Sequence, residues 1–398
     1  EIVDAFQKPQ RIYTLRDMNA VLRPVGHQQI ADATTQLHVE ASASGDHLQR
    51  FTIQGTIEPQ SGKWEFHGKQ VHVDLSPTLR DALPVELSTH IGSLGPLVAK
   101  SDMSFDVAYD PQRERPLMYS VYGGLRNGRL EDPRLPYPLT DVTAAFRCNH
   151  QTAVVDQVKA RYGGATVELT IERDGHGSAE SLVAHGNVKN FTLREDLVSR
   201  LAPEIQQIWK KFKPLGNLDA DFAFTRRNGQ WSPSIEVNCH DVSLAWESFP
   251  YPLNNTTGTI SIRDAEMAFE LRSRGTPSPV QIRGHVYDPG PRWRGWFEAQ
   301  SEGPVPIDEA LMAAGSQQMQ GLVRPFSPRG NLEFVTRSER ARGDLPVNKG
   351  ATVQLVDCSI QHEKLPYPLS HVYGQLELIN GHWKFRELTG RNDTARIQ

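Results

Sequence analysis

Apolar and polar residues alternate along most of this chain. In residues 259–262 (TISI) and 266–271 (EMAFEL) every second side chain is apolar, which is the period of a strand with one buried face. The same alternation returns in residues 280–286, and residues 234–237 lead into a further strand. Such runs are frequent enough to predict an antiparallel meander of about five or six strands in each stretch of the chain.

In residues 194–212 the apolar side chains recur every three to four residues, so this segment interrupts the predicted strands. Pro203 predicts a break into two short helices there, because it lacks an amide proton and clashes with the preceding turn. The segment 308–323 has the same period and begins with Asp308, a favourable N-cap residue. The apolar stripe of the first of these segments comprises Leu197, Val198, Leu201, Ile205, Ile208, Trp209 and Phe212.

One pentapeptide occurs three times, as LPYPL at 135–139, FPYPL at 249–253 and LPYPL at 365–369. The second copy begins 114 residues after the first, and the third begins 116 residues after the second. A fixed long period is typical of repeat proteins, in which each unit packs only on its neighbours. The sequence therefore predicts a mainly β fold: an elongated repeat of antiparallel strands that forms a curled sheet or groove, with one short helical segment per repeat of about 115 residues.

The period divides the chain into four stretches. We predict a partial N-terminal repeat at 1–75, a first repeat at 76–190, a second at 191–304 and a truncated third at 305–398. The incomplete first and last stretches suggest a piece of a longer protein.

The two prolines of each pentapeptide remove two backbone donors, so this element is expected to resist strand pairing. We interpret it as an extended crossing between strands, with the tyrosine ring packed and its hydroxyl in solvent. A recognition loop is the alternative.

Charge and composition argue against several classes of protein. The net charge is −4, which provides no electrostatic footprint for a nucleic-acid partner. Three cysteines at unrelated repeat positions do not form a disulfide framework. No run of residues is long and apolar enough to read as a membrane span.

Motifs for catalysis, cofactors or metals are not found. The chain has no nucleophile elbow, phosphate loop or dinucleotide fingerprint, and its fourteen histidines do not adopt the spacing of a metal site. Asp241 and Asp357 recur in register, but Asn127 occupies this place in the first copy. We interpret them as solvated carboxylates at a turn or strand start, and predict no catalytic residues, no cofactor and no metal.

The recurring pattern resembles the AsmA-like family of cell-envelope proteins, together with the TamB-type and other repeating-β-groove, bridge-like lipid transfer proteins. The residues that carry it are Asp-x-Ser-Leu, then Leu/Phe-Pro-Tyr-Pro-Leu, then a glycine before alternating strands, as in 258–262 and 374–378. The resemblance implies a curled sheet with an apolar concave face. It also implies a periplasmic location, an inner-membrane anchor in segments outside this chain, and a role in phospholipid movement or outer-membrane maintenance.

An apolar sheet face that one short helix per repeat covers only in part would form a groove for acyl chains. An ordinary sandwich core beneath the helices remains the alternative, because periodicity defines a face and not what it contacts. The expected groove residues are Ile260, Ile262, Met267, Phe269, Leu271, Val280, Ile282, Leu376, Leu378, Trp383 and Phe385.

Three functions are therefore open. The first is a non-enzymatic envelope protein that binds or conducts phospholipid, or another acyl-chain lipid, along the groove. The second is a scaffold that assists outer-membrane protein assembly or bridges envelope partners through its sheet edges. The third is an extracytoplasmic, polysaccharide-active enzyme.

Overall fold

In a computed structural model, which describes most of the chain, the contacts divide the chain into two units. Unit 1 comprises Glu1–Val188 and Ala223–Trp231, and unit 2 comprises Lys189–Phe222 and Ser232–Gln398. The described residues are 2–4, 11–13, 15–25, 36–82, 96–133, 135–175, 181–201, 203–247, 249–275, 278–315, 317–364, 367–379, 382–393 and 395–398.

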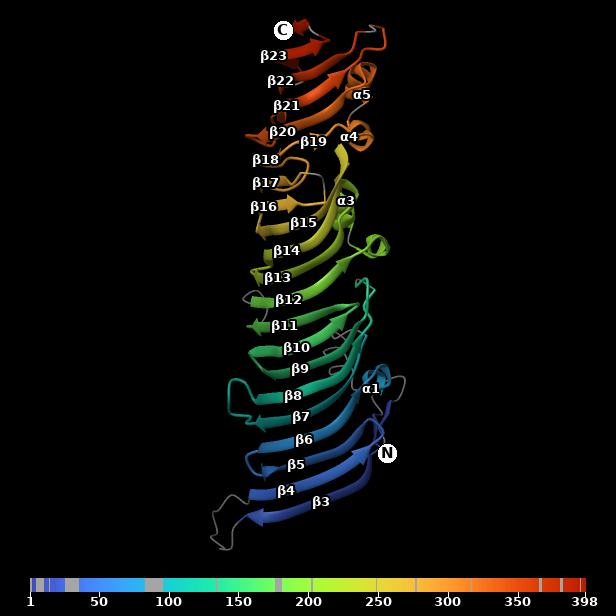
Figure 1. The fold of residues 1–398 in the computed structure, drawn as a ribbon. Helices are drawn as coiled ribbons and strands as arrows, with labels where there is room; N and C mark the ends of the chain where they lie inside the picture. Colours follow the sequence, from blue (N-terminus) through green and yellow to red (C-terminus); the bar gives the residue numbers. More distant parts are fainter. Residues whose placement is uncertain are drawn as a thin grey trace. The chain divides into compact units, whose positions relative to one another are not determined.

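The predicted mainly β fold is confirmed: 22 strands of the described residues form one antiparallel sheet (Figure 1). Each strand pairs with the next along the chain, except that β18 and β19 both pair with β20. The sheet is not closed, and its edge strands are β3 and β24. The bounds up to β12 are β3 Leu15–Val25, β4 Gln36–Gly45, β5 Leu48–Glu58, β6 Lys63–Leu75, β7 Leu97–Tyr109, β8 Leu117–Leu130, β9 Leu139–Asn149, β10 Thr152–Tyr162, β11 Ala165–Asp174 and β12 Ser181–Leu193. The remainder are β13 Leu215–Arg227, β14 Gln230–Trp246, β15 Phe249–Arg263, β16 Glu266–Ser273, β17 Val280–Tyr287, β18 Arg294–Ser301, β19 Val305–Pro306, β20 Arg329–Arg340, β21 Asn348–Ile360, β22 Leu369–Ile379, β23 His382–Asn392 and β24 Ala395–Ile397. A separate two-stranded sheet pairs β1 (Ile2–Asp4) with β2 (Arg11–Tyr13).

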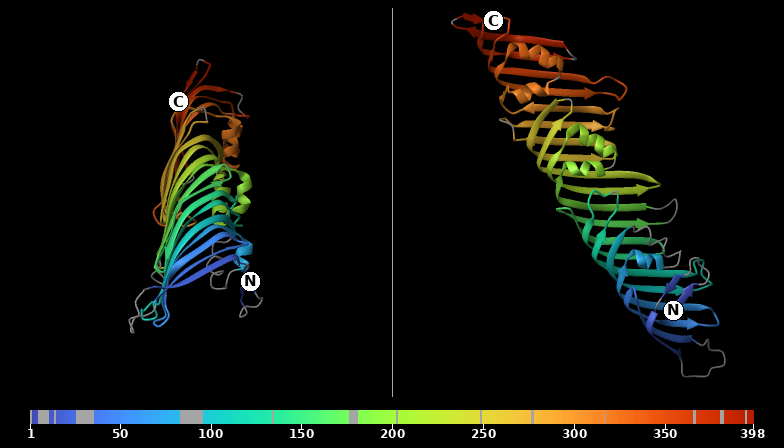
Figure 2. Two further views of the ribbon diagram at one scale, coloured as in Figure 1. Left: turned by 90° about the horizontal axis from the view of Figure 1, so that it is seen from below. Right: turned by 90° about the vertical axis from the view of Figure 1, so that its right-hand side faces the viewer.

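One helical segment per repeat is present, as predicted, and each lies near one end of the strands (Figures 1 and 2). The break expected at Pro203 is found, since a 3-10 turn ends at Arg200 and α3 begins at Pro203. The Asp308 side chain caps α4 by accepting a hydrogen bond from the Leu311 amide at 2.8 Å. The segments are α1 (Pro77–Ala82); η2 (Glu195–Arg200) with α3 (Pro203–Phe212); and α4 (Glu309–Ala314) with α5 (Gln317–Val323) and η3 (Arg324–Phe326).

The sheet is curled within each unit (Figure 2), and β-bulges at matching levels of neighbouring strands account for the bend. In unit 1 the pairing register shifts at Asn127 in β8 and is repeated at Asp141 in β9. In unit 2 it shifts at Asp357 in β21 and at His371 in β22. These four residues have φ between 48° and 53°, a left-handed conformation that Asp and Asn tolerate better than most residues. The recurring aspartate therefore belongs to a bulge inside a strand, and its interpretation as a strand-start residue is wrong.

The structure describes the first and second pentapeptides, whereas Leu365 and Pro366 of the third copy lie outside the described residues. The second copy lies inside β15, where Phe249 and Leu253 pair with β14 and the two prolines fall at unpaired positions. The expectation that the element resists strand pairing is therefore wrong for this copy. In the first copy the strand begins only at Leu139, after the prolines.

The chain exposes far more surface than a compact fold. Its accessible surface is 25494 Å², whereas a compact protein of this mass exposes about 15,600 Å², and two compact units of half the mass about 18,800 Å² together. A sheet that is mostly one layer thick explains the excess, because much of each face remains in contact with solvent.

Candidate functional site: an apolar face of unit 2

The first group of predicted groove residues lies on one face of β15, β16 and β17. Residues that pair directly across an antiparallel ladder share a face. Ile260 pairs with Phe269, and Ile262 pairs with Met267. Leu271 pairs with Ile282, and Val280 with Ser273, so the seven predicted residues of these strands point to the same side of the sheet.

The second group lies on this same face, with β18, β20 and β21 between it and the first group. Leu376 pairs with Phe385, and Leu378 pairs with Trp383. A continuous path of paired positions joins the two groups across β18, β20, β21 and β22: Ile282, Ala299, Thr336, Ala351 and Leu378. The structure thus brings all eleven residues onto one face of unit 2, which we call the apolar face.

The residues of the apolar face differ in exposure. Leu271 and Val280 are buried, and Leu271 packs with Cys239 and Val242 in a small core. For these positions the sandwich-core alternative describes the surroundings better than an open groove. The other predicted residues are half-buried or exposed, and Phe385 retains 64% of its accessible surface.

The helices cover only part of this face. Helix α4 packs against Tyr251 of the second pentapeptide, in a cluster with Val305, Leu311 and Ala314. Trp246, at the end of β14, meets Phe297 of β18 edge-on, with ring centroids 6.0 Å apart. The tryptophan therefore lies against this face at Phe297.

A phenylalanine lying against a glycine on the next strand is a recurring feature that sequence reasoning missed. A Cβ on Gly284 would lie 2.5 Å from Cζ of Phe269, so only glycine leaves room for this ring. In unit 1 Phe105 lies in the same way against Gly68. A glycine inside an alternating strand pattern is the signal that could have indicated this close approach.

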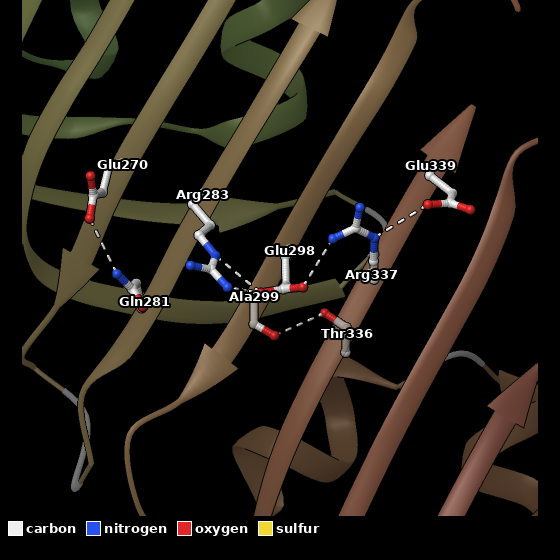
Figure 3. A network of polar contacts seen from close by, with 8 residues as sticks. All are labelled: Glu270, Gln281, Arg283, Glu298, Ala299, Thr336, Arg337 and Glu339. Atoms are coloured by element: carbon white, nitrogen blue, oxygen red, sulfur yellow. Dashed lines mark hydrogen bonds and ion pairs between the residues drawn. The ribbon is translucent and has the colours of Figure 1, made fainter. Parts of the chain in front are cut away.

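The opposite face of unit 2 is polar, and charged side chains pair across its strands (Figure 3). Glu298 lies between Arg283, at 2.7 Å, and Arg337, at 3.4 Å. The hydrogen bond from Arg283 is the main reason why the pKa of the Glu298 carboxyl is held below its usual range, with Arg337 adding to the effect. The charged side chains of this face are therefore paired with one another. This face differs in that respect from the apolar face.

Two other carboxylates accept hydrogen bonds from the backbone amides of residues with positive φ. Asp219 accepts a hydrogen bond from the Asn190 amide at 2.7 Å, and Asp102 accepts one from His72 at the same distance. These backbone donors are the main reason for the lowered pKa of each carboxyl. Asp357 and His371 are both well exposed and pair at 2.8 Å. None of these arrangements places two carboxylates together for acid–base chemistry.

Among the described residues, no group of three or more His, Cys, Asp or Glu side chains is arranged to hold a metal ion. The three cysteines are free thiols, and burial raises the pKa of Cys239 and Cys358, which makes them unreactive. No helix among the described residues has the length and apolar character needed to span a bilayer.

Comparison with known proteins gives no match: no family model, no curated protein and no solved structure is significantly similar to this chain. Inference about function therefore rests on the sequence and the geometry of the chain itself.

Proposed function

We propose that the chain is a non-enzymatic, lipid-binding protein whose apolar face holds the acyl chains of a phospholipid. The observation that carries this proposal is the apolar face of unit 2, which continues from β15 to β23 and on which nine of the eleven predicted side chains keep some contact with solvent. Apolar surface of this extent that is open and bordered by polar residues is typical of a binding site.

The physical driving force is removal of apolar surface from water. Each methylene of an acyl chain that becomes buried contributes on the order of 0.8 kcal/mol. The half-buried side chains Ile260, Met267 and Phe269 would lose their remaining contact with water at the same time. A charged headgroup would stay at the border of the face, since burying an unpaired charge is costly.

The resemblance of the pentapeptide repeats to AsmA-like proteins supports a place in the cell envelope. In this proposal the protein works in the periplasm, with an inner-membrane anchor in segments outside this chain, and it binds or conducts phospholipid for outer-membrane maintenance. The repeat and the curled sheet are the features that agree with it.

A scaffold that bridges envelope proteins is the second candidate. The edge strand β3 favours it, because its eleven residues pair only with β4 among the described strands and expose Met18 and Leu22. An open edge of this kind can accept a strand from another chain. Crosslinks from β3 to proteins, with no lipid bound at the apolar face, would favour the scaffold.

The direct test is lipid content after detergent-free purification, measured by native mass spectrometry. The triple variant Ile260→Asp, Phe269→Asp, Leu376→Asp is expected to lose most of its bound lipid, because a carboxylate beside an acyl chain is strongly unfavourable. The matched control Ala268→Asp, Gln281→Asp, Gln375→Asp places each acid on the polar face, opposite His285, Arg272 and Arg386. The control should keep its lipid. Equal lipid content in the two variants, or none in the parent protein, would contradict the proposal.

A further inference from the structure

The carboxyl end of α3 combines exposed basic and aromatic side chains. Lys210, Lys211, Phe212 and Lys213 are all exposed, and Phe212 retains 43% of its accessible surface. The helix ends where Lys213 adopts a left-handed conformation (φ 42°), and its amide donates to the Trp209 carbonyl at 2.6 Å. The four exposed residues therefore form the carboxyl end of the helix and the residue that terminates it.

Trp246 adjoins this end of the helix. The amide of the following residue, Glu247, donates to the Lys211 carbonyl at 2.7 Å, so the end of β14 is attached to the end of the helix. Trp246 retains 37% of its accessible surface, and its ring also contacts Phe297 of the apolar face. We call Lys210, Lys211, Phe212, Lys213 and Trp246 the rim patch; through Trp246 it is continuous with the apolar face.

The rim patch carries three positive charges beside a single attached acid among the described residues. None of its three lysines forms an ion pair with a described residue, and Glu247 is the acid attached to the patch. One repeat later, Arg324 holds the place of Lys210 and pairs with Glu309 at 2.6 Å. The rim patch therefore has an excess of positive charge. At the corresponding place in the next repeat the positive charge is paired with a carboxylate.

The helix dipole explains the lysines of the rim patch but not its aromatic residues. Cations at the carboxyl end of a helix are favoured by its dipole, which accounts for lysines in the last turn. The dipole gives no reason to expose Phe212 and Trp246 beside them. Aromatic rings flanked by lysines are instead typical of surfaces that enter the headgroup layer of a membrane.

We propose that the rim patch docks unit 2 onto the surface of a bilayer that contains anionic phospholipid. The lysines contact the lipid phosphates, and Phe212 and the exposed edge of Trp246 enter the headgroup layer. Docking brings the apolar face next to a source of lipid, and in this respect the inference rests on the proposed function. The charge surplus selects an anionic membrane as the occupant over a neutral one.

The test measures binding of the full chain to vesicles by flotation. One set of vesicles is phosphatidylcholine alone, and in the other part of it is replaced by phosphatidylglycerol. The parent protein should float only with the anionic vesicles and should dissociate as salt is raised. Lys210→Glu with Lys211→Glu should weaken this binding by about 30-fold or more, since each basic residue near an anionic surface contributes roughly a five-fold gain.

The control variant carries Lys69→Glu in β6 and Lys384→Glu in β23, which change the net charge equally at exposed lysines outside the rim patch. It should bind about as well as the parent protein. Phe212→Ser should also weaken binding to the anionic vesicles. Because it removes an apolar contact, this loss should be about the same at low and at high salt.

Three results would overturn the inference: equal binding to both kinds of vesicle, equal loss in the control, or binding of soluble polyglutamate without binding of vesicles. The last result would assign the rim patch to an acidic protein. Native mass spectrometry of the same samples separates the two proposals. Lipid in the apolar face without vesicle binding defeats only docking, and vesicle binding without such lipid defeats only the proposed function.

Discussion

At the scale of single residues, Asp219 shows how a side chain supports the backbone of another strand. Asn190 lies within β12 in a left-handed conformation (φ 57°), and an unsatisfied backbone amide is costly. Asp219 accepts a hydrogen bond from the Asn190 amide and also contacts His240 at 2.9 Å. The carboxylate thus stabilises this local distortion of the strand.

Asp219→Ala should lower the free energy of unfolding by about 1.5–3 kcal/mol at pH 7, the typical contribution of a hydrogen bond to a charged group. The pKa of the Asp219 carboxyl is lowered from its ordinary value of 3.8, chiefly by the Asn190 amide. A lowered folded-state pKa gives stability that is present above pH 3.8 and is lost as the pH falls through the folded value. The difference between parent and variant should therefore shrink towards pH 3.

Urea unfolding at pH 7 and at pH 3 checks this, with Asp221→Ala as the control at an exposed carboxylate. A loss of stability that is as large at pH 3 as at pH 7 would show that the charge of Asp219 is not its cause.

Some of these residue-level features could be predicted and others could not. The recurrence of Asp241 and Asp357 is visible in the sequence, and their solvated character was expected. Their place in a bulge was not, because a bulge depends on the register of two strands, which a single sequence does not specify. The contact of Phe269 with Gly284 has the same origin, since the two residues meet only once β16 and β17 are paired.

At the scale of elements, the ends of the helices could be predicted from the sequence better than the strand structure of the pentapeptides. The break at Pro203 and the Asp308 cap were predicted correctly because both depend on a few adjacent residues. The structure of the pentapeptide was harder to predict, because its surroundings differ between the copies. Tyr251 retains 7% of its accessible surface under α4, whereas Tyr367 retains 71%.

This contrast gives a prediction within one motif. Tyr251→Ala should lower the free energy of unfolding by about 3–5 kcal/mol, as expected when a buried aromatic side chain is removed and leaves a cavity. Tyr367→Ala should change it by less than about 0.5 kcal/mol, as is usual for exposed positions. Thermal or urea unfolding of the two variants provides the measurement, and equal effects would mean that α4 does not pack on Tyr251 in solution.

At the scale of the whole molecule, the alternating pattern correctly predicted a mainly β repeat with an apolar and a polar face. It could not decide whether the apolar face is covered, because that depends on where the helices pack and not on periodicity. The structure gives a mixed answer. Leu271 and Val280 lie in a core, while Ile260, Phe269 and Phe385 remain accessible.

The most direct measurement of the central claim is photocrosslinking at neighbouring positions of one strand. A benzophenone side chain is placed at Phe269 or Phe385 on the apolar face, and at Glu270 or Lys384 on the polar face. The protein is irradiated with radiolabelled phospholipid. The account predicts lipid adducts at 269 and 385 and none at 270 and 384. Equal labelling of both faces, or protein adducts alone at 269 and 385, would contradict it.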